Sequence, residues 1–170
     1  GTMTTAFLTL RLAIGDCAFR ELPFEQIPDE VASGRADFGL LIHEGQLTYG
    51  DQHLHLVVDL GKWWMSETGL PLPLGANGVR KDLGTDAIRE INRLLKESIA
   101  YGLAHRRPAL EHALQFGRGL DPAKVDRFVG MYVNNLTLGY TDDSRRAVRL
   151  FLDEAHEKGL IPSRVPVEFA

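Results

Sequence analysis

"FGLLIHEGQLTYG", residues 38–50, runs from a nearly continuous apolar stretch into a histidine and an acid. Apolar runs of strand length without alternation are typical of a strand that is covered on both faces, as in a parallel sheet. The segment "HLHLVVDL", residues 53–60, is a second such run. A sheet of this kind needs helices on both faces, so these stretches favour an α/β fold.

The residues before these two runs predict helices and a further strand. Residues 4–14 predict a largely buried helix whose N-cap is Thr4 or Thr2. A short strand over 19–24 and a short helix over 23–34, which ends at a glycine, follow it. The order helix, strand, helix, strand, strand is typical of an α/β layer.

The character of the sequence changes after the tryptophan pair Trp63 and Trp64. The segment "ETGLPLPLGANG", residues 67–78, carries two prolines and three glycines among apolar residues. This composition is unsuited to a helix and to a central strand. We therefore expect a loop or hinge that leads into a strand over 76–80.

The rest of the chain is predicted to be almost wholly helical. Apolar spacings of three and four residues, together with N-terminal Thr, Asp or Pro and C-terminal Gly or Asn, indicate four helices. Thr85 or Asp86 is expected to cap the first helix and Asp121 the third, and the four helices span residues 85–106, 107–117, 121–135 and 141–159. We expect an α/β lobe over 1–80 and a mostly helical segment over 81–170.

Composition excludes several classes of function. The 170 residues carry a formal net charge of −4, and the 19 Lys and Arg are scattered along the chain, which argues against nucleic acid as a partner. No run of about 18 apolar residues is present, so we expect no membrane partner. The one cysteine, Cys17, suits a reducing compartment, and we expect a cytoplasmic protein.

A candidate site follows from the position of His43. Ligands of open α/β sheets collect at the carboxyl ends of strands, and His43 is predicted to lie at such an end. The start of the helix at Thr4 would form the other half, since its first backbone amides have no helical acceptor and its dipole favours an anion. The hydroxyls of Thr4 and Thr5 add donors. A small carboxylate would fit this site.

Each candidate also has a structural interpretation. A histidine at a strand end commonly has a purely structural role, and a Thr-Thr pair before a helix is commonly only a cap. Glu44 is expected to cap or to lie on the rim. His53 and His55 would share one face of a strand, but no third ligand has suitable spacing, so no metal is expected. Trp63-Trp64 can stack on an aromatic ligand, although burial against the sheet is the better interpretation.

Four motifs in order resemble one known family. They are "GTMTTAFLTLRL" (1–12), "GRADFGLLIHEGQLTY" (34–49), "VVDLGKWWMSETGLPLPLGANGVRKDLG" (57–84) and "MYVNNLTLGY" (131–140). The chain resembles the 1,4-dihydroxy-6-naphthoate synthase family, lyases of the futalosine route to menaquinone, over nearly its whole length. "IHEG" followed by "TGLPLPLG" is the specific part of this resemblance.

The resemblance implies a fold, an activity and site residues. The family is similar to type 2 periplasmic-binding proteins, with two lobes of three-layer α/β/α architecture and substrate in the cleft between them. The resemblance implies that His43 is the general base and that no cofactor is needed. It also implies that the substrate binds at a helix start formed by Thr4, Thr5 and Ala6. The implied reaction converts cyclic dehypoxanthinyl futalosine to 1,4-dihydroxy-6-naphthoate. Compared with the family, this chain begins late and lacks an N-terminal portion.

Three alternatives stay open. The chorismate dehydratase of the same pathway shares the fold and the tryptophan-rich approach to "TGLP", although the "LPLG" continuation favours the lyase. A solute-binding protein for small carboxylates would bind the same ligands without turnover. A non-catalytic fragment would expose apolar surface where a first lobe should dock. The sequence does not indicate an oligomeric state.

Overall fold

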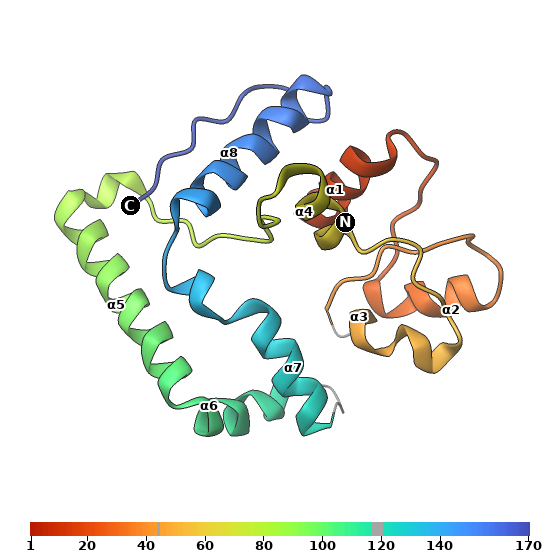
Figure 1. Ribbon diagram of the computed structural model, residues 1–170, viewed down its shortest axis with the longest axis horizontal. Coiled ribbons are helices and arrows are strands. Elements are labelled where there is room, and N and C mark those ends of the chain that lie inside the picture. Colours follow the sequence, from red (N-terminus) through yellow and green to blue (C-terminus); the bar gives the residue numbers. More distant parts are fainter. Residues whose placement is uncertain (44, 117–120) are drawn as a thin grey trace. The chain divides into compact units, whose positions relative to one another are not determined.

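The computed structural model describes residues 1–43, 45–116 and 121–170, and helices are its main elements (Figure 1). Contacts divide the chain into two units. Unit 1 contains residues 1–75 and 142–167, and unit 2 contains residues 76–141 and 168–170. We expected one part over 1–80 and another over 81–170. The last long helix, within residues 142–167, packs in unit 1.

Unit 1 is built from five α-helices and two short 3₁₀ turns among its described residues. The helices are α1 (Thr5–Ile14), α2 (Ile27–Ala32), α3 (Gly45–Thr48), α4 (Leu60–Thr68) and α8 (Asp142–Glu157), and the turns are η1 (Phe24–Gln26) and η2 (Tyr49–Gln52). Both α4 and α8 contribute to the core against α1. Helix α8 therefore packs in the same core as α1 and α4, although it comes from the C-terminal part of the chain.

The core of unit 1 lies where α1, α4 and α8 meet. Leu12, Trp64 and Phe151 are almost fully buried there, one from each helix. Partly buried apolar side chains surround them, namely Leu8, Trp63, Leu72, Leu150, Leu152 and Leu160. The expected burial of Trp64 is confirmed, but it packs on helices rather than on a sheet.

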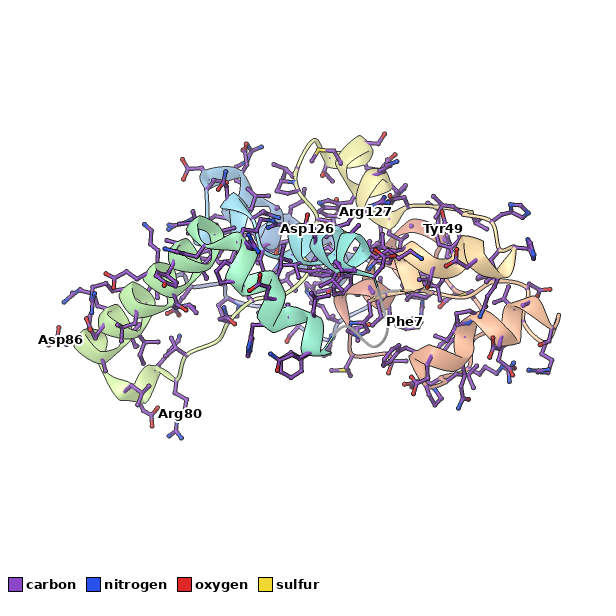
Figure 2. All side chains as sticks on the ribbon, turned by 90° about the horizontal axis from the view of Figure 1, so that it is seen from below. Phe7, Tyr49, Arg80, Asp86, Asp126 and Arg127 are labelled. Carbon is purple, nitrogen blue, oxygen red and sulfur yellow. The ribbon has the colours of Figure 1, made fainter. Side chains whose placement is uncertain are left out.

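Unit 2 is a chain of helices with a smaller core. It contains η3 (Lys81–Leu83), α5 (Thr85–Ala104), α6 (Arg106–Ala113), η4 (Leu114–Phe116), α7 (Pro122–Tyr132) and η5 (Asn135–Leu138). Val125 is its one buried apolar residue among those described. Arg106 links α6 to α7 by donating to the Asp126 carboxylate at 2.8 Å and to the Asp126 carbonyl oxygen at 3.0 Å. Figure 2 shows Arg80 and Asp86, by contrast, extending away from the ribbon.

The expected strands are wrong for the described part of the chain. None of the residues expected in strands over 19–24, 36–42, 53–60 and 76–80 belongs to a strand. A strand requires hydrogen bonds to a neighbouring backbone, and these segments form no ladder of such bonds with one another. The expected α/β layer is therefore absent from the described residues, whereas the largely helical C-terminal part is confirmed.

Local helix signals were mostly read correctly. Thr4 caps α1 and Asp121 caps α7, each accepting from the amide three residues on. The expected cap of α5 is wrong: Gly84 holds the N-cap position, where φ is 80° and no side chain caps the helix. The expected end of the second C-terminal helix at Gly117 lies outside the described residues. No helix among the described residues is long and apolar enough to cross a membrane.

Candidate functional site

Thr4, the N-cap residue of α1, uses its hydroxyl in hydrogen bonds to nearby backbone groups. Thr4 has an extended backbone, and its Oγ1 accepts from the Phe7 amide at 3.2 Å and donates to the Gly1 carbonyl oxygen at 2.9 Å. An extended residue whose side chain accepts from a first-turn amide is the ordinary N-cap arrangement. The Thr4 hydroxyl proton is therefore already donated within the protein.

Thr5 ties α1 to the proline-rich segment. Its hydroxyl donates to the Leu74 carbonyl oxygen at 2.6 Å, across 69 residues of sequence. The "TTA" and "TGLPLPLG" motifs are thus in direct contact. Because both hydroxyl protons are used, the groups at this helix start that can donate to a ligand are the backbone amides of Thr5 and Ala6, which have no helical acceptor.

His43 is exposed and ends an extended segment. Residues 38–42 run without helix, turn or bend, and His43 follows in the left-handed region with φ of 56°. Its carbonyl oxygen accepts from the Gln46 amide at 3.2 Å, and its ring lies 4.9 Å from that of Phe24 between centroids. The side chain is therefore at a turn, as expected of a loop residue at a chain reversal, although no strand precedes it. Glu44 lies outside the described residues.

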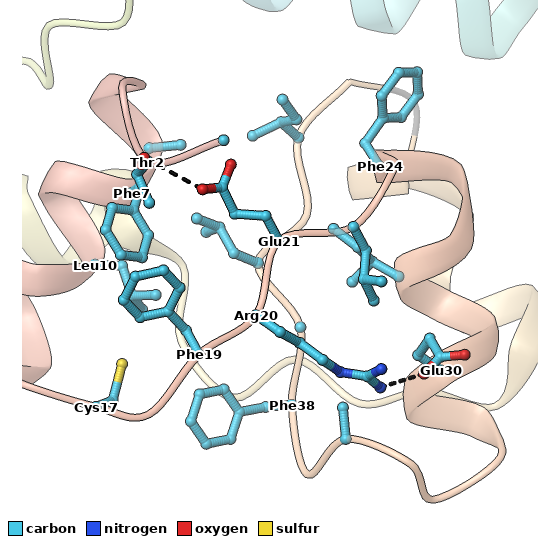
Figure 3. A pocket seen from close by; sticks show the side chains of 18 of the residues that line it. Thr2, Phe7, Leu10, Cys17, Phe19, Arg20, Glu21, Phe24, Glu30 and Phe38 are labelled. Atoms are coloured by element: carbon cyan, nitrogen blue, oxygen red, sulfur yellow. Dashed lines mark hydrogen bonds and ion pairs between the residues drawn. The ribbon is translucent and has the colours of Figure 1, made fainter.

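A groove in unit 1 brings part of the predicted site together. It has a volume of about 430 Å³, and Thr4, Ala6 and Ile42 are among its lining residues. Figure 3 shows the groove from close by, with Phe7 and Phe19 on its wall. Thr5 and His43 are not lining residues, although each directly adjoins one. The helix start and the chain leading into His43 therefore border one groove, and the imidazole lies beside its lining.

A charged cluster at this groove was missed by the sequence analysis. Arg20 and Arg35 both pair with the carboxylate of Glu30, and Arg35 Nε and Nη2 donate to Glu30 Oε1 at 2.8 and 2.6 Å. These hydrogen bonds, that of Arg35 first and that of Arg20 next, lower the pKa of Glu30 below its usual range. Helical spacing in the sequence could not have predicted this cluster, because Arg20 lies outside α2, the helix that contains Glu30.

The other candidates of the sequence analysis do not form a site. His53 lies at the end of η2 with φ of 60° rather than in a strand with His55. Trp64 is completely buried. In residues 1–43, 45–116 and 121–170, no group of three or more His, Cys, Asp or Glu could hold a metal ion. The groove beside His43 is therefore the candidate site that combines an exposed titratable side chain with a helix start.

Comparison with known proteins places the chain in a family. The model of a family described as menaquinone biosynthesis matches residues 1–157, so the chain belongs to that family. A 1,4-dihydroxy-6-naphthoate synthase of Thermus thermophilus is 39% identical over 168 residues, which cover 98% of this chain and 62% of that protein. One of Streptomyces coelicolor is 32% identical and covers 96% and 60%. The chain thus spans about three fifths of the length of these curated relatives.

A solved structure shares the fold. The crystal structure of a protein from Archaeoglobus fulgidus is 42% identical and matches with a TM-score of 0.89 over 95% of this chain and 61% of that protein. The backbone course of the described segments is therefore that of a larger related protein, of which about two fifths lie outside the match.

Proposed function

We propose that this chain forms the His43-bearing part of a carbon-carbon lyase of menaquinone biosynthesis. The reaction is conversion of cyclic dehypoxanthinyl futalosine to 1,4-dihydroxy-6-naphthoate. Membership of the menaquinone family supports the pathway. Two relatives that carry the name of the synthase favour this reaction over dehydration of chorismate. Because the chain spans three fifths of those proteins, the remaining segment would complete the enzyme.

His43 is the proposed general base. The observation that carries this role is its position: the side chain is exposed at a left-handed turn, directly after a residue that lines the groove shared with Thr4 and Ala6. A neutral imidazole is suited to removing a proton at neutral pH. Positioned base catalysis contributes roughly 10²–10⁴ in rate, so His43 would supply a large but partial share of the acceleration.

The start of α1 is the proposed carboxylate site. Its backbone amides at Thr5 and Ala6 point out of the first turn, and the helix dipole adds about 0.3–1 kcal/mol for an anion there. The two threonine hydroxyls fix the geometry of this turn through Gly1 and Leu74 rather than by binding the substrate with their protons. Such a preorganised donor set can also stabilise negative charge that develops in the reaction.

The proposed architecture is a two-lobed protein of the type 2 periplasmic-binding class, with residues 1–80 in the lobe that carries His43. The resemblance of the four sequence motifs supports it. So do the contacts of one extended segment with two helices, since Phe19 packs on Phe7 of α1 and Arg20 pairs with Glu30 of α2. Substrate would bind between the lobes without a cofactor, and the lone thiol suits the cytoplasm.

The test compares two histidines with the same backbone conformation. His43→Asn and His53→Asn are each produced, because His43 and His53 are the non-glycine residues with positive φ in the part of the chain that the structure describes, and asparagine tolerates that region. The chain is assayed together with the segment of the T. thermophilus relative that lies outside the match, and product is measured by mass spectrometry. Turnover should fall about 100-fold or more in His43→Asn only.

Binding separates the lyase from its alternatives. Affinity for the naphthoate product, followed by tryptophan fluorescence, should be nearly unchanged in His43→Asn. Equal loss of turnover in both variants would contradict the role of His43. Product binding without turnover in any assembled sample would favour a solute-binding protein.

A further inference from the structure

The backbone of His43 is fixed by a turn, but an exposed side chain on a turn has several rotamers open to it. The residue has φ of 56°, and its carbonyl oxygen accepts from the Gln46 amide at 3.2 Å. A general base must come within about 2.6–3.2 Å of the proton that it removes, so its rotamer decides whether it can act. A base at this turn therefore requires a neighbour that orients its ring.

Phe24 is a neighbour of the right kind. Its ring centroid lies 4.9 Å from that of the His43 imidazole, and the two ring planes are tilted by 53°. Aromatic pairs at this separation favour their contact geometry by roughly 2–13-fold. Phe24 is also one of the side chains that line the groove (Figure 3). One phenyl ring therefore contacts both the groove and the imidazole that lies beside its lining.

The local structure holds Phe24 in place. Its carbonyl oxygen accepts from the Ile27 amide, and the Gln26 amide donates to the Pro23 carbonyl oxygen at 2.9 Å. Pro23 has φ of −51°, which its own ring restricts. These bonds form η1, and the chain continues without a break into α2. The position of the phenyl ring is thus tied to that of α2.

Helix α2 is in turn attached to the chain on both sides of His43. Before it, a Cβ added to Gly39 would lie 2.4 Å from Cγ2 of Ile27, so that backbone packs directly on α2. After it, the side-chain amide of Gln52 in η2 donates to Asp29 Oδ1 of α2 at 3.1 Å. The ring contact between η1 and the turn is therefore supported by two further contacts that flank it in sequence.

We propose that Phe24 is a positioning residue of the lyase. Its ring restricts the His43 imidazole to a rotamer beside the groove, and it acts through His43 rather than on the reacting atoms. This inference rests on the proposed role of His43 as general base.

The contact itself is tested by NMR on the chain alone, without an activity assay. A neighbouring aromatic ring displaces the resonances of the His43 ring protons, which are assigned by their loss in His43→Asn. Phe24→Leu should move these resonances toward those of free histidine, whereas Phe24→Tyr keeps the ring and should leave them displaced. Resonances of His43 that do not respond to Phe24→Leu would overturn the proposal.

A second histidine and phenylalanine pair provides the matched control. His112 and Phe116 lie in unit 2 with ring centroids 5.5 Å apart. Phe116→Leu should move the His112 resonances and leave those of His43 unchanged. A shift of the His43 resonances in Phe116→Leu as large as that in Phe24→Leu would overturn the proposal, since the response would not be specific to Phe24.

The effect on catalysis is measured after assembly with the remaining segment of the T. thermophilus relative, as in the test of His43. Phe24→Leu should lower kcat by roughly 2–13-fold with KM nearly unchanged, because substrate binds as before but the base is oriented less often. Phe24→Tyr should restore most of kcat, and Phe116→Leu should match the unaltered chain. A raised KM with unchanged kcat would overturn the proposal, since Phe24 would then bind substrate instead.

The double variant separates this inference from the proposed function. Once His43→Asn has removed the base, Phe24 has nothing to orient, so adding Phe24→Leu should not lower the residual turnover further. The same fold loss in both backgrounds would overturn the role of Phe24 and leave that of His43 intact. Full turnover in His43→Asn alone would instead contradict the proposed function, and the role of Phe24 with it.

Discussion

Trp64 and Phe151 meet edge to face, with ring centroids 5.4 Å apart and ring planes at 77°. Trp64 belongs to α4 and Phe151 to α8, and both side chains are at most 1% exposed. An aromatic pair in this geometry contributes about 0.5–1.5 kcal/mol beyond the burial of its area. The contact therefore joins the first 75 residues to a helix that begins at residue 142.

Phe151→Ala should strongly destabilise unit 1. Truncation of a buried Phe to Ala costs about 3–5 kcal/mol, because it removes buried area and leaves a cavity. Both tryptophans of the chain lie in α4, so urea unfolding followed by tryptophan fluorescence reports this unit alone. Met65→Ala, on the same helix as Trp64 but 48% exposed, should change stability by about 0.5 kcal/mol or less. Equal effects of the two substitutions would contradict the assigned core.

Thr5→Val should release the proline-rich segment from α1. The substitution keeps the shape of the side chain and removes the hydrogen bond to the Leu74 carbonyl oxygen, at a cost of about 0.5–1.5 kcal/mol. Limited proteolysis and amide exchange around residues 69–75 should both become faster. Thr5→Ser retains the hydroxyl and should leave both rates close to those of the original chain. Faster cleavage in Thr5→Ser but not in Thr5→Val would show that the methyl group, not the hydrogen bond, holds the segment.

Stability of the α2 region should fall in acid through Glu30. Arg35 and Arg20 lower the pKa of Glu30 in the folded protein. The ionised carboxylate is therefore favoured by folding, and its contribution is fully present above the unfolded value near 4.5 and is lost as pH falls through the lowered folded value. Glu30→Gln should lower stability at pH 7 and make it less dependent on pH below about 4.5. Parallel pH profiles of the two proteins, measured by urea unfolding, would contradict this account.

Asp121→Ala should loosen the start of α7. The Asp121 carboxylate accepts from the Lys124 amide at 2.8 Å, and loss of an N-cap costs about 0.5–2 kcal/mol. Amide exchange in the first turn of α7 should become faster, whereas Asp121→Asn, which can still accept, should retain most of the protection. A uniform change throughout unit 2 in both variants would contradict a local capping role.

Sequence reasoning succeeded where the determining contacts are local. The caps at Thr4 and Asp121 depend on residues within one turn, so spacing predicted Asp121 and limited the cap of α1 to Thr4 or Thr2. The cap of α5 was wrong because the chain enters that helix through Gly84 at positive φ, a conformation that side-chain preferences of Thr85 and Asp86 do not reveal. Helix periodicity also could not indicate that α8 packs beside α1 and α4, since any amphipathic helix only requires some apolar surface.

The predicted site depended partly on contacts that span the sequence. The cap at Thr4 is one of the two expected positions, and it follows from local cap preferences. His43 was expected at the end of a strand, and it lies at a turn that no strand precedes. The bond from Thr5 to Leu74 and the cluster around Glu30 join segments from different parts of the chain. Such contacts arise only when segments assemble, and one sequence without its relatives does not specify them. The strands failed for the same reason, because each requires a partner that the described residues do not supply.

Unit 1 is built from two separate stretches of sequence, residues 1–75 and 142–167, and this has a consequence for its biosynthesis. Its core needs Phe151, which follows Trp64 by 87 residues, so a ribosome must add those residues before α1 and α4 can bury their apolar faces. Until then the nascent polypeptide carries Trp64 and Leu12 uncovered, a state in which chaperone binding competes with aggregation. Synthesis should therefore be the stage at which this protein depends most on the quality-control machinery of its cell.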